Sequence, residues 1–210
     1  MKVGIIGLGR MGEGMSRRMI KAGIEVHGYR NNYEKACEQY EAGYISGCTT
    51  SLESLVQVIH SKKGVLTDTA RVPGIFMMVV PAETVEDTLN ELLQFCVEGD
   101  IIIDHGNSNF KDSRRRAERL SKLGIQYLDC GTSGGVYGLE RGYCLMVGGS
   151  DIAVSACRPI FDALSPGIDA APRTDDGSWV SPAERGWLRC GGPGAGHFVK
   201  MVHNLSLIHI

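Results

Sequence analysis

Short apolar runs alternate with amphipathic runs along most of the chain. Apolar runs at 2–8, 24–30, 74–80, 100–104, 125–130 and 144–149 have the length of buried strands. The runs between and after them, at 15–23, 33–43, 51–59, 83–96, 111–124 and 152–165, have the apolar spacing of helices, with Ser51 as an N-cap. Strands that alternate with helices predict parallel pairing through crossover helices. The pattern therefore predicts an α/β fold built on a doubly wound, Rossmann-like parallel sheet.

The pattern stops after Pro166. Residues 167–190 contain two further prolines and no clear period, which predicts an irregular linker, and a new helix is predicted from about Pro193. We therefore divide the chain into a cofactor-binding Rossmann-like domain at 1–178 and a second segment at 179–210. That segment is predicted to be the linker and the start of a new helix.

Composition narrows the class of protein. The hydrophobic content of 43% and charged content of 22% are typical of a globular protein. A net charge of -2 argues against nucleic acid as the main partner. No apolar run approaches the ~20 residues that span a bilayer, so we expect no membrane partner and a cytoplasmic location. Arg114, Arg115 and Arg116 are interpreted as a solvated helix face, with phosphate binding as the alternative.

The cysteines and histidines do not indicate a metal centre. The seven cysteines are scattered without a C-x-x-C pair, which favours reduced, mostly buried thiols over disulfides or zinc. His197 and His203 are six residues apart and fall on different faces of a helix. We expect no metal site.

The stretch "GLGRMG", residues 7–12, matches the G-x-G-x-x-G pattern of a dinucleotide-binding turn. It lies where a first strand ends and a first helix begins. Gly7 permits the tight turn, Gly9 lets a pyrophosphate approach the backbone, and Gly12 lets helix and strand pack closely. The helix N-terminus, with Leu8, Arg10 and Met11 around it, supplies N–H groups and partial positive charge. The alternative is a glycine turn without a ligand.

The end of the second strand bears on which dinucleotide binds. An NAD site usually has an acidic residue there, whereas this chain has Arg30, Asn31 and Asn32. A guanidinium pairs with a 2′-phosphate that a carboxylate would repel. The sequence favours NADP, with NAD as the alternative if Arg30 is only a surface residue.

Three further stretches carry candidate substrate groups. "DHGNSN" places Asn107 and Ser108 after the strand at 100–104, at the sheet edge where ligands bind. "GTSGGVYGLERG" supplies Ser133 with Gly134 and Gly135, a possible carboxylate-binding nest. For both, a simple tight turn is the alternative.

The third stretch, "GHFVKMVHN", places Lys200, His203 and Asn204 at positions i, i+3 and i+4, on one helical face. A desolvated lysine has its pKa lowered from about 10.4 and can act as a base. The alternative is a surface lysine beside a satisfied histidine.

Taken together, these stretches resemble the shorter, decarboxylating type of the 6-phosphogluconate dehydrogenase family. The resemblance extends from Met1 to Asn204 and rests on "GLGRMG", "MMVVPAETV", "GDIIIDHGNS", "LDCGTSGGVYGLERGYCLMVGG", "AAPRT" and "GAGHFVKMVHN". The wider 3-hydroxyacid dehydrogenase superfamily shares the glycine loop and a lysine. One departure is His105, where the family usually has glycine.

The resemblance implies roles for these residues in oxidative decarboxylation of 6-phosphogluconate to ribulose 5-phosphate with reduction of NADP. Lys200 would be the base, and Ser133, Gly134 and Gly135 would hold the carboxylate. Asn107, His203 and Asn204 would position hydroxyl groups, and Val80 and Ala82 would line the cofactor, with Asn107 also near it. The parent protein would be a homodimer or homotetramer.

The chain departs from the family at its end. At the position of Leu207 the family has a glutamate that protonates the enediol. By the resemblance, the segment at 179–210 is the linker and first helix of an all-helical domain that carries phosphate-binding groups, and the remainder of that domain is missing. The terminal "LSLIHI" is interpreted as foreign sequence on a gene fragment. We expect this 210-residue chain to bind cofactor with little turnover. An active decarboxylase and a dinucleotide-binding fragment both remain open, as does another 3-hydroxyacid dehydrogenase.

Overall fold

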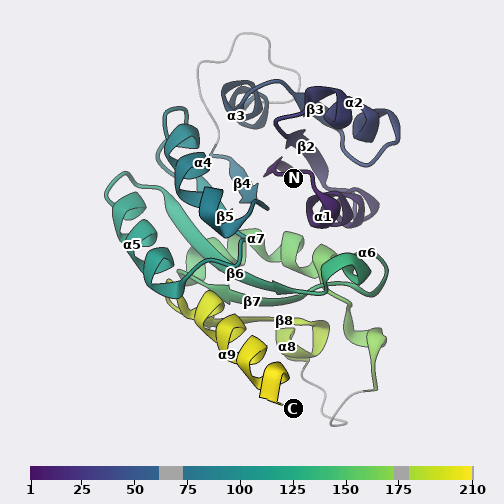
Figure 1. Ribbon diagram of the computed structural model, residues 1–210, viewed down its shortest axis with the longest axis vertical. Coiled ribbons are helices and arrows are strands. Elements are labelled where there is room, and N and C mark those ends of the chain that lie inside the picture. Colours follow the sequence, from purple (N-terminus) through teal and green to yellow (C-terminus); the bar gives the residue numbers. More distant parts are fainter. Residues whose placement is uncertain (62–72, 173–179, 210) are drawn as a thin grey trace.

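A computed structural model of the chain describes residues 1–61, 73–172 and 180–209. The described residues form one sheet with the strand order β3-β2-β1-β4-β5-β6-β7-β8 (Figure 1). The strands are β1 (Lys2–Ile6), β2 (Glu25–Tyr29), β3 (Gly47–Thr49), β4 (Ile75–Met78), β5 (Ile101–Asp104), β6 (Gln126–Ser133), β7 (Cys144–Gly148) and β8 (Trp187–Gly191). The doubly wound α/β fold predicted from the sequence is confirmed.

Helices cover both faces of the sheet. They are α1 (Arg10–Lys21), α2 (Tyr33–Glu41), α3 (Leu52–His60), α4 (Val85–Leu92), α5 (Phe110–Ser121), α6 (Gly138–Arg141), α7 (Asp151–Leu164), α8 (Pro182–Arg185) and α9 (Ala195–His209). Three short 3-10 turns complete the list: η1 (Ala82–Thr84), η2 (Gly135–Tyr137) and η3 (Ile168–Ala170).

Two hydrophobic clusters, one on each face, hold these layers together. Met15 and Met19 of α1 pack with Phe161 of α7 on one face. Leu55 of α3 and Leu89 of α4 pack with neighbouring helices on the other. Each strand of the sheet centre is buried on both sides, which is why these strands appear in the sequence as continuous apolar runs.

Strand direction departs from the prediction at one pair. β5 and β6 are parallel, but β7 pairs antiparallel with β6, from Asp129 opposite Gly148 to Ser133 opposite Cys144. Only residues 134–143 connect the two strands, which is too short for the dozen or more residues of a parallel crossover. The expectation of an entirely parallel sheet is therefore wrong at β7.

The predicted linker also differs from the structure. Within residues 167–190, α8 has a capping box at Ser181, and Trp187 begins β8, which pairs parallel with β7. The linker interpretation is therefore wrong for residues 187–190, which belong to β8 at the edge of the same sheet. The proposed boundary between residues 178 and 179 lies outside the described residues.

The ends of three helices can be compared with the sequence prediction. Ser51 caps α3 through a bond from the backbone N–H of Ser54 at 3.1 Å, as predicted. α1 begins earlier than its apolar pattern, at Arg10, because Gly9 takes the N-cap position without any side-chain bond. α4 is shorter than predicted and ends at Leu92.

The cysteines are free thiols, but the expectation that most are buried is wrong. Cys130 and Cys157 are buried, and Cys144 is exposed. The sulfurs of Cys37 and Cys48 lie 3.1 Å apart. No helix in the described ranges has the length and apolar character needed to cross a membrane.

Candidate functional site

The glycine loop joins β1 to α1 in the geometry that the sequence predicts. Gly7 has a φ of +96°, which favours glycine, and its Cα faces the Val79 carbonyl so closely that a side chain would clash. A Cβ on Gly12 would overlap the Gly7 carbonyl. A Cβ on Gly9 would meet nothing within 4 Å, so the backbone there faces open space. The loop leaves room for a ligand at Gly9 and at no other of its glycines.

A cavity of about 630 Å³ lies on one side of this loop. Its lining includes Gly7, Leu8, Gly9, Arg30, Asn31, Val80 and Glu91. A second cavity of about 500 Å³ lies on the other side and includes Gly9, Met11, Val80, Ala82, His105, Asn107, Thr132, Lys200 and Asn204. Both cavities touch Gly9 and the run Val79–Pro81. Because they share these residues, we treat the two as one groove, from the end of β2 to Lys200, that passes the open backbone of Gly9.

Arg30 and its neighbours define the nucleotide end of this groove. The Arg30 guanidinium donates to the Leu8 carbonyl at 3.1 Å, and the Gln39 amide donates to the same oxygen at 3.2 Å. Asn32 accepts a bond from the backbone N–H of Lys35 and caps α2. Arg30 is therefore tied to the glycine loop and lies beside Asn31 in the cavity.

The loop that carries Asn107 is ordered by the buried carboxylate of Asp104, at the end of β5. That carboxylate accepts bonds from the Gly106 N–H at 2.8 Å, the Ser108 hydroxyl at 2.8 Å and the Tyr127 hydroxyl at 2.7 Å. Arg116 approaches the same carboxylate at 3.5 Å and pairs with Glu86 at 2.8 Å. The acid is fully buried and its bonds fix the turn that presents Asn107 to the groove.

The same contacts revise the interpretation of the three arginines. Arg116 is only 5% exposed, whereas Arg115 is 65% exposed and pairs with Asp112 at 2.8 Å. The solvated-face interpretation is therefore wrong for Arg116, because the buried Asp104 draws its guanidinium inward.

Helix α9, which carries Lys200, is anchored at its N-terminus by Asp129 of β6. The buried Asp129 carboxylate accepts the Gly194 N–H at 2.6 Å and the His197 N–H at 2.8 Å. His197 also contacts the Ser113 hydroxyl of α5 through Nδ1 at 2.8 Å. A negative charge at a helix N-terminus is favourable, and its burial makes these bonds strong.

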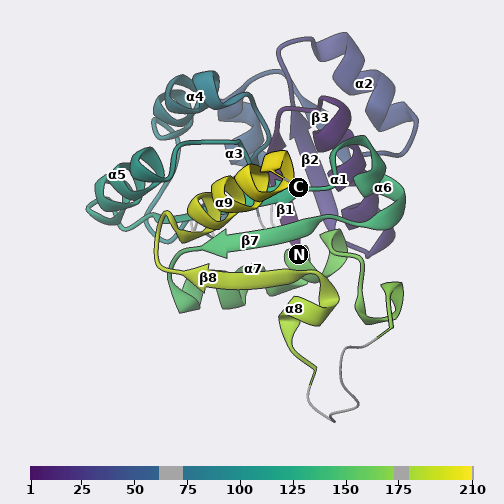
Figure 2. The same cartoon turned by 60° about the horizontal axis from the view of Figure 1, so that its bottom comes forward.

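Two glycines let α9 lie directly on the sheet beside α5, as the two ribbon views show (Figures 1 and 2). A Cβ on Gly131 would clash with the Cβ of Lys200. A Cβ on Gly196 would clash with the Met146 carbonyl. The stem of Lys200 therefore crosses β6 at Gly131 on its way into the groove.

Lys200 lies half-buried in the second cavity. Burial lowers the pKa of its ammonium, and the nearby Cys144 thiol opposes this in part. No hydrogen bond or ion pair of the Lys200 ammonium occurs within the described part of the chain.

Several predicted site residues lie outside the two cavities. Arg10 is exposed at the start of α1, and Gly12 is buried beneath the loop. His203 is half-buried, and its Nδ1 has no partner within the described ranges. Ser133 ends β6 opposite Cys144, one strand position beyond Thr132, and Gly134 and Gly135 lead into η2. The structure thus brings Lys200 together with Asn107 and Asn204. The side chain of Leu207 lies outside the described residues.

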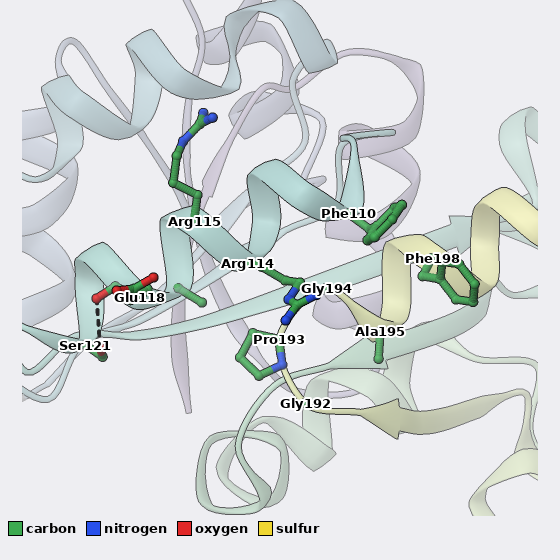
Figure 3. Close-up of a pocket in the computed structure, with 11 residues that line it drawn as sticks. Phe110, Arg114, Arg115, Glu118, Ser121, Gly192, Pro193, Gly194, Ala195 and Phe198 are labelled. Carbon is green, nitrogen blue, oxygen red and sulfur yellow. Dashed lines mark hydrogen bonds between the residues drawn. The ribbon is translucent and has the colours of Figure 1, made fainter.

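A larger cavity, of about 870 Å³, lies between α5 and the start of α9 (Figure 3). Arg114 extends toward Gly194 there, while Arg115 points away, and Phe110 meets Phe198 edge to face at 5.2 Å. This cavity shares no lining residue with the groove and contains none of the predicted site residues. We therefore place the candidate site in the groove.

Sequence reasoning missed the buried groups that hold the site in place. Asp104, Asp129 and Thr132 lie within the quoted motifs but were given no role, and Ser113 lies outside them. A usable signal did exist for the two acids, because each follows apolar residues of a buried strand, in "DIIID" and "IQYLD", where a charge is costly without partners. Among the described residues, no group of three or more histidine, cysteine or acidic side chains could hold a metal ion.

Comparisons with known proteins find relatives that are similar to nearly all of this chain. The model of the NAD binding domain of 6-phosphogluconate dehydrogenase matches residues 2–171. The chain is 37% identical over 204 residues to the NAD(+)-dependent, decarboxylating 6-phosphogluconate dehydrogenase of Haloferax volcanii, covering 97% of this chain and 58% of the relative. It is 34% identical to the decarboxylating enzyme of Haemophilus influenzae, covering 96% of this chain and 38% of that one.

Solved structures give the same picture. Plasmodium falciparum 6-phosphogluconate dehydrogenase, solved apo and with NADP+ or 6-phosphogluconate, superposes with a TM-score of 0.76 at 26% identity, over 97% of this chain and 40% of that one. Salmonella typhimurium 3-hydroxyisobutyrate dehydrogenase gives a TM-score of 0.73 at 25% identity, over 98% of this chain and 61% of that one. The chain spans well under two thirds of the length of each of these relatives. By its sequence and its fold, the chain belongs to the 6-phosphogluconate dehydrogenase family and contains that family's NAD-binding domain.

Proposed function

We propose that this groove serves the oxidative decarboxylation of 6-phosphogluconate to ribulose 5-phosphate, with NADP as the hydride acceptor. The observation that carries the proposal is the position of Lys200. Its amine lines the same cavity as the open backbone of Gly9 and the side chain of Asn107. A base beside a dinucleotide groove is what the oxidation of a hydroxyl group requires.

Lys200 has two tasks in this reaction. As the neutral amine it takes the proton of the substrate hydroxyl that lies beta to the carboxylate, while the hydride leaves the same carbon. NADP supplies the acceptor for that hydride. The resulting beta-keto acid loses carbon dioxide, and the electrons of the broken carbon–carbon bond move toward the ketone oxygen. Lys200, now protonated, donates to that oxygen and stabilises the enediolate.

The remaining predicted residues are assigned to the two ligands. Asn107 and Asn204 line the cavity with Lys200 and are proposed to bind substrate hydroxyls, with His203 one turn from Lys200 on α9. Ser133, Gly134 and Gly135 are proposed to hold the carboxylate with backbone and hydroxyl donors. Gly7, Leu8, Gly9, Arg10, Met11, Gly12, Val80 and Ala82 are proposed to hold the cofactor.

The choice of NADP over NAD is based on Arg30 and Asn31, which lie where an NAD site usually has an acid. The guanidinium is tied to the Leu8 carbonyl by one nitrogen. Its remaining donors are proposed to pair with the 2′-phosphate. Relatives are named with each cofactor, so the assignment depends on this residue.

The wider context follows from the family. We propose that the reaction is a cytoplasmic step of the pentose phosphate pathway and gluconate metabolism. The parent protein is proposed to act as a homodimer or homotetramer.

Cofactor choice is tested by titrating NADPH and NADH against the chain and against Arg30→Asp. We expect tighter NADPH binding, and we expect Arg30→Asp to lose at least tenfold for NADPH alone, since a bidentate charge pair is lost and a repulsion is added. Lys35→Asp, which makes the same charge change outside the cavity, is the control. Equal affinities that Arg30→Asp leaves unchanged would overturn the assignment.

The reaction is tested by NADPH formation from NADP and 6-phosphogluconate, with gluconate and 3-hydroxyisobutyrate as competing substrates. Lys200→Met should abolish whatever turnover the chain shows and leave NADPH affinity within about twofold, because the cofactor loop is untouched. Turnover that survives Lys200→Met, or a preference for 3-hydroxyisobutyrate, would refute the proposal.

A further inference from the structure

Two thiols meet between α2 and the edge strand β3. The sulfurs of Cys37 and Cys48 lie 3.1 Å apart, and both residues are half-buried free cysteines. All seven cysteines belong to the described residues, and no other two of their sulfurs make contact there. A disulfide bond is about 2 Å long, so these two sulfurs need to approach by about 1 Å to form one.

The sheet turns the side chain of Cys48 toward α2. Cys48 pairs with Gly28 of β2, and side chains at paired positions of neighbouring strands lie on the same face. A Cβ on Gly28 would meet Leu8 and Ile45, which belong to the same hydrophobic cluster as Ala36 of α2. Cys48 packs against that cluster as well. Its sulfur therefore lies on the face of the sheet that α2 covers.

Helix α2 is held in place on either side of Cys37. Asn32 caps its start by accepting the Lys35 N–H at 3.0 Å, and Gln39 donates to the Leu8 carbonyl at 3.2 Å. Cys37 lies between these two anchors. Both sulfurs are thus presented by backbone that other bonds fix, in a helix and in a paired strand, and their closure falls to rotation of the two side chains.

The two thiols differ in their surroundings. Burial raises the pKa of the Cys48 thiol, and the neighbouring Cys37 raises it further. Tyr33 precedes Cys37 by four residues and shares its face of α2. Hydrogen bonding to Cys37, and then to Cys48, raises the pKa of the Tyr33 hydroxyl to about 12. Because the thiolate is the attacking form of cysteine, burial makes Cys48 a poor attacking group.

We propose that Cys37 and Cys48 form a redox-active dithiol site, which small-molecule disulfides of the glutathione type oxidise reversibly to a cross-link between α2 and β3. The site is separate from the groove, since neither cysteine is among the residues that line its two cavities. It adjoins the nucleotide end, because Asn32, the cap of α2, lines the cavity there. The inference stands independently of the proposed function.

The oxidation consists of two balanced exchange steps. The Cys37 thiolate attacks one sulfur of the small disulfide, whose sulfur–sulfur bond breaks and releases one small thiolate. The Cys48 thiolate then attacks the Cys37 sulfur of this mixed disulfide and releases the second. The two protein thiols have lost two electrons and two protons, and the small disulfide has gained both as two thiols. An excess of the small thiol reverses the same steps.

The site is tested by incubating the 210-residue chain with oxidised glutathione at about pH 8, then quenching with acid and alkylating the remaining thiols. No lysine or arginine lies between the two cysteines, so trypsin leaves both in one peptide, whereas cleavage after Glu38 and Glu41 separates them.

We expect the tryptic peptide to lack two hydrogens and to carry no alkyl group. After the glutamate-specific cleavage, two peptides should stay joined until they are reduced. The exposed Cys144, which has no sulfur beside it in the described structure, should carry glutathione instead. Absence of the internal bond, whether or not Cys144 reacts, would overturn the proposal.

Matched variants separate the geometry of the site from ordinary thiol reactivity. Cys37→Ser and Cys48→Ser each leave one thiol, which should stop at a mixed disulfide with glutathione. Closure of the wild-type pair is intramolecular, so at a fixed concentration of reduced glutathione its half-oxidation should need at least tenfold less oxidised glutathione than half-modification of either variant. Equal requirements would mean that the fold does not hold the sulfurs together. The wild-type peptide map decides the matter if a variant fails to fold.

The fit of the cross-link is read from stability and cofactor binding. A bond between two fixed elements restricts the unfolded chain, so the oxidised protein should unfold at a higher urea concentration than the reduced one. Cys37→Ser treated with the same oxidant should show no such shift. NADPH affinity should change less than threefold, because neither cysteine lines the groove. A lower urea midpoint on oxidation, or a larger loss of NADPH affinity, would mean that α2 moves to close the bond, which contradicts a preformed site.

Discussion

Helices α1 and α9 flank the same groove and are held against the sheet by opposite means. α1, which follows the glycine loop, buries Met15 and Met19 completely and leaves Lys21 exposed. α9, which carries Lys200, buries Gly196 and His197. Its apolar side chains face outward: Phe198, Val199, Met201, Val202 and Leu205 are 37–50% exposed. Hydrophobic burial is the main contact of α1, to which Arg18 adds bonds to distant backbone carbonyls, whereas buried polar anchors hold the start of α9.

The difference has a physical consequence for function. Hydrophobic burial is not directional and tolerates small shifts, but hydrogen bonds to a buried carboxylate fix distance and orientation. A dinucleotide loop needs only open backbone at Gly9. The base proposed at Lys200 would have to meet one hydroxyl group, and a misplacement of about 1 Å can cost about a hundredfold in rate.

The largest expected effect comes from removing the anchor of α9. Asp129→Ala leaves the N–H groups of Gly194 and His197 without their acceptor, and each bond to a charged group contributes about 1.5–3 kcal/mol. We expect the free energy of unfolding in urea to fall by about 4 kcal/mol. Asn109→Ala, which removes the exposed cap of α5, should cost only about 1 kcal/mol. Similar losses for both would mean that α9 is held by something other than Asp129.

The second effect depends on pH. His105 has a folded-state pKa of about 4 against an ordinary value of 6.5, so the unfolded chain binds more protons between these values. The contribution of His105 to stability is complete above about pH 6.5 and is lost as pH falls to about 4, by roughly 3 kcal/mol in total. His105→Leu should remove this part of the pH dependence. Parallel stability curves for the two proteins between pH 4 and 6.5 would contradict it.

A third test compares one glycine from each end of the groove. Gly9→Ala places a methyl group in empty space, so folding should be unaffected while NADPH affinity falls at least tenfold. Gly131→Ala forces the stem of Lys200 away from β6. It should leave NADPH affinity within about twofold and move the amide signals of α9. If both variants lose cofactor affinity equally, the two ends are not independent.

The two ends also differed in how far the sequence predicted them. The fold was predicted from the alternation of apolar and amphipathic runs, because it depends on local periodicity. The loop was predicted from the glycine pattern at 7–12, because it depends on glycine geometry. Lys200 was found from its spacing to Asn204. Asp129 and His197 were not, since they meet only after β6 and α9 come together, 68 residues apart. β8 was not predicted because "WLRCG" has no clear alternation of apolar and polar residues. Only Trp187 of this strand is buried, and the strand is recognised by its pairing with β7.

The smallest expected effect separates helix capping from charge at the nucleotide end. Asn32 lines that cavity, and its side-chain oxygen accepts the Lys35 N–H at 3.0 Å. Asn32→Ala removes the cap and should cost about 1 kcal/mol of unfolding free energy. Asn32→Asp keeps a good cap, so its stability should stay within about 0.5 kcal/mol of the wild type.

The same substitution, Asn32→Asp, places a carboxylate where a 2′-phosphate would lie, so NADPH should bind more weakly while NADH binds as well or better. NADPH and NADH titrations of both variants measure this. If Asn32→Asp weakens both cofactors alike, the 2′-phosphate does not lie beside α2, and the contrast between the two helices applies to their anchoring alone.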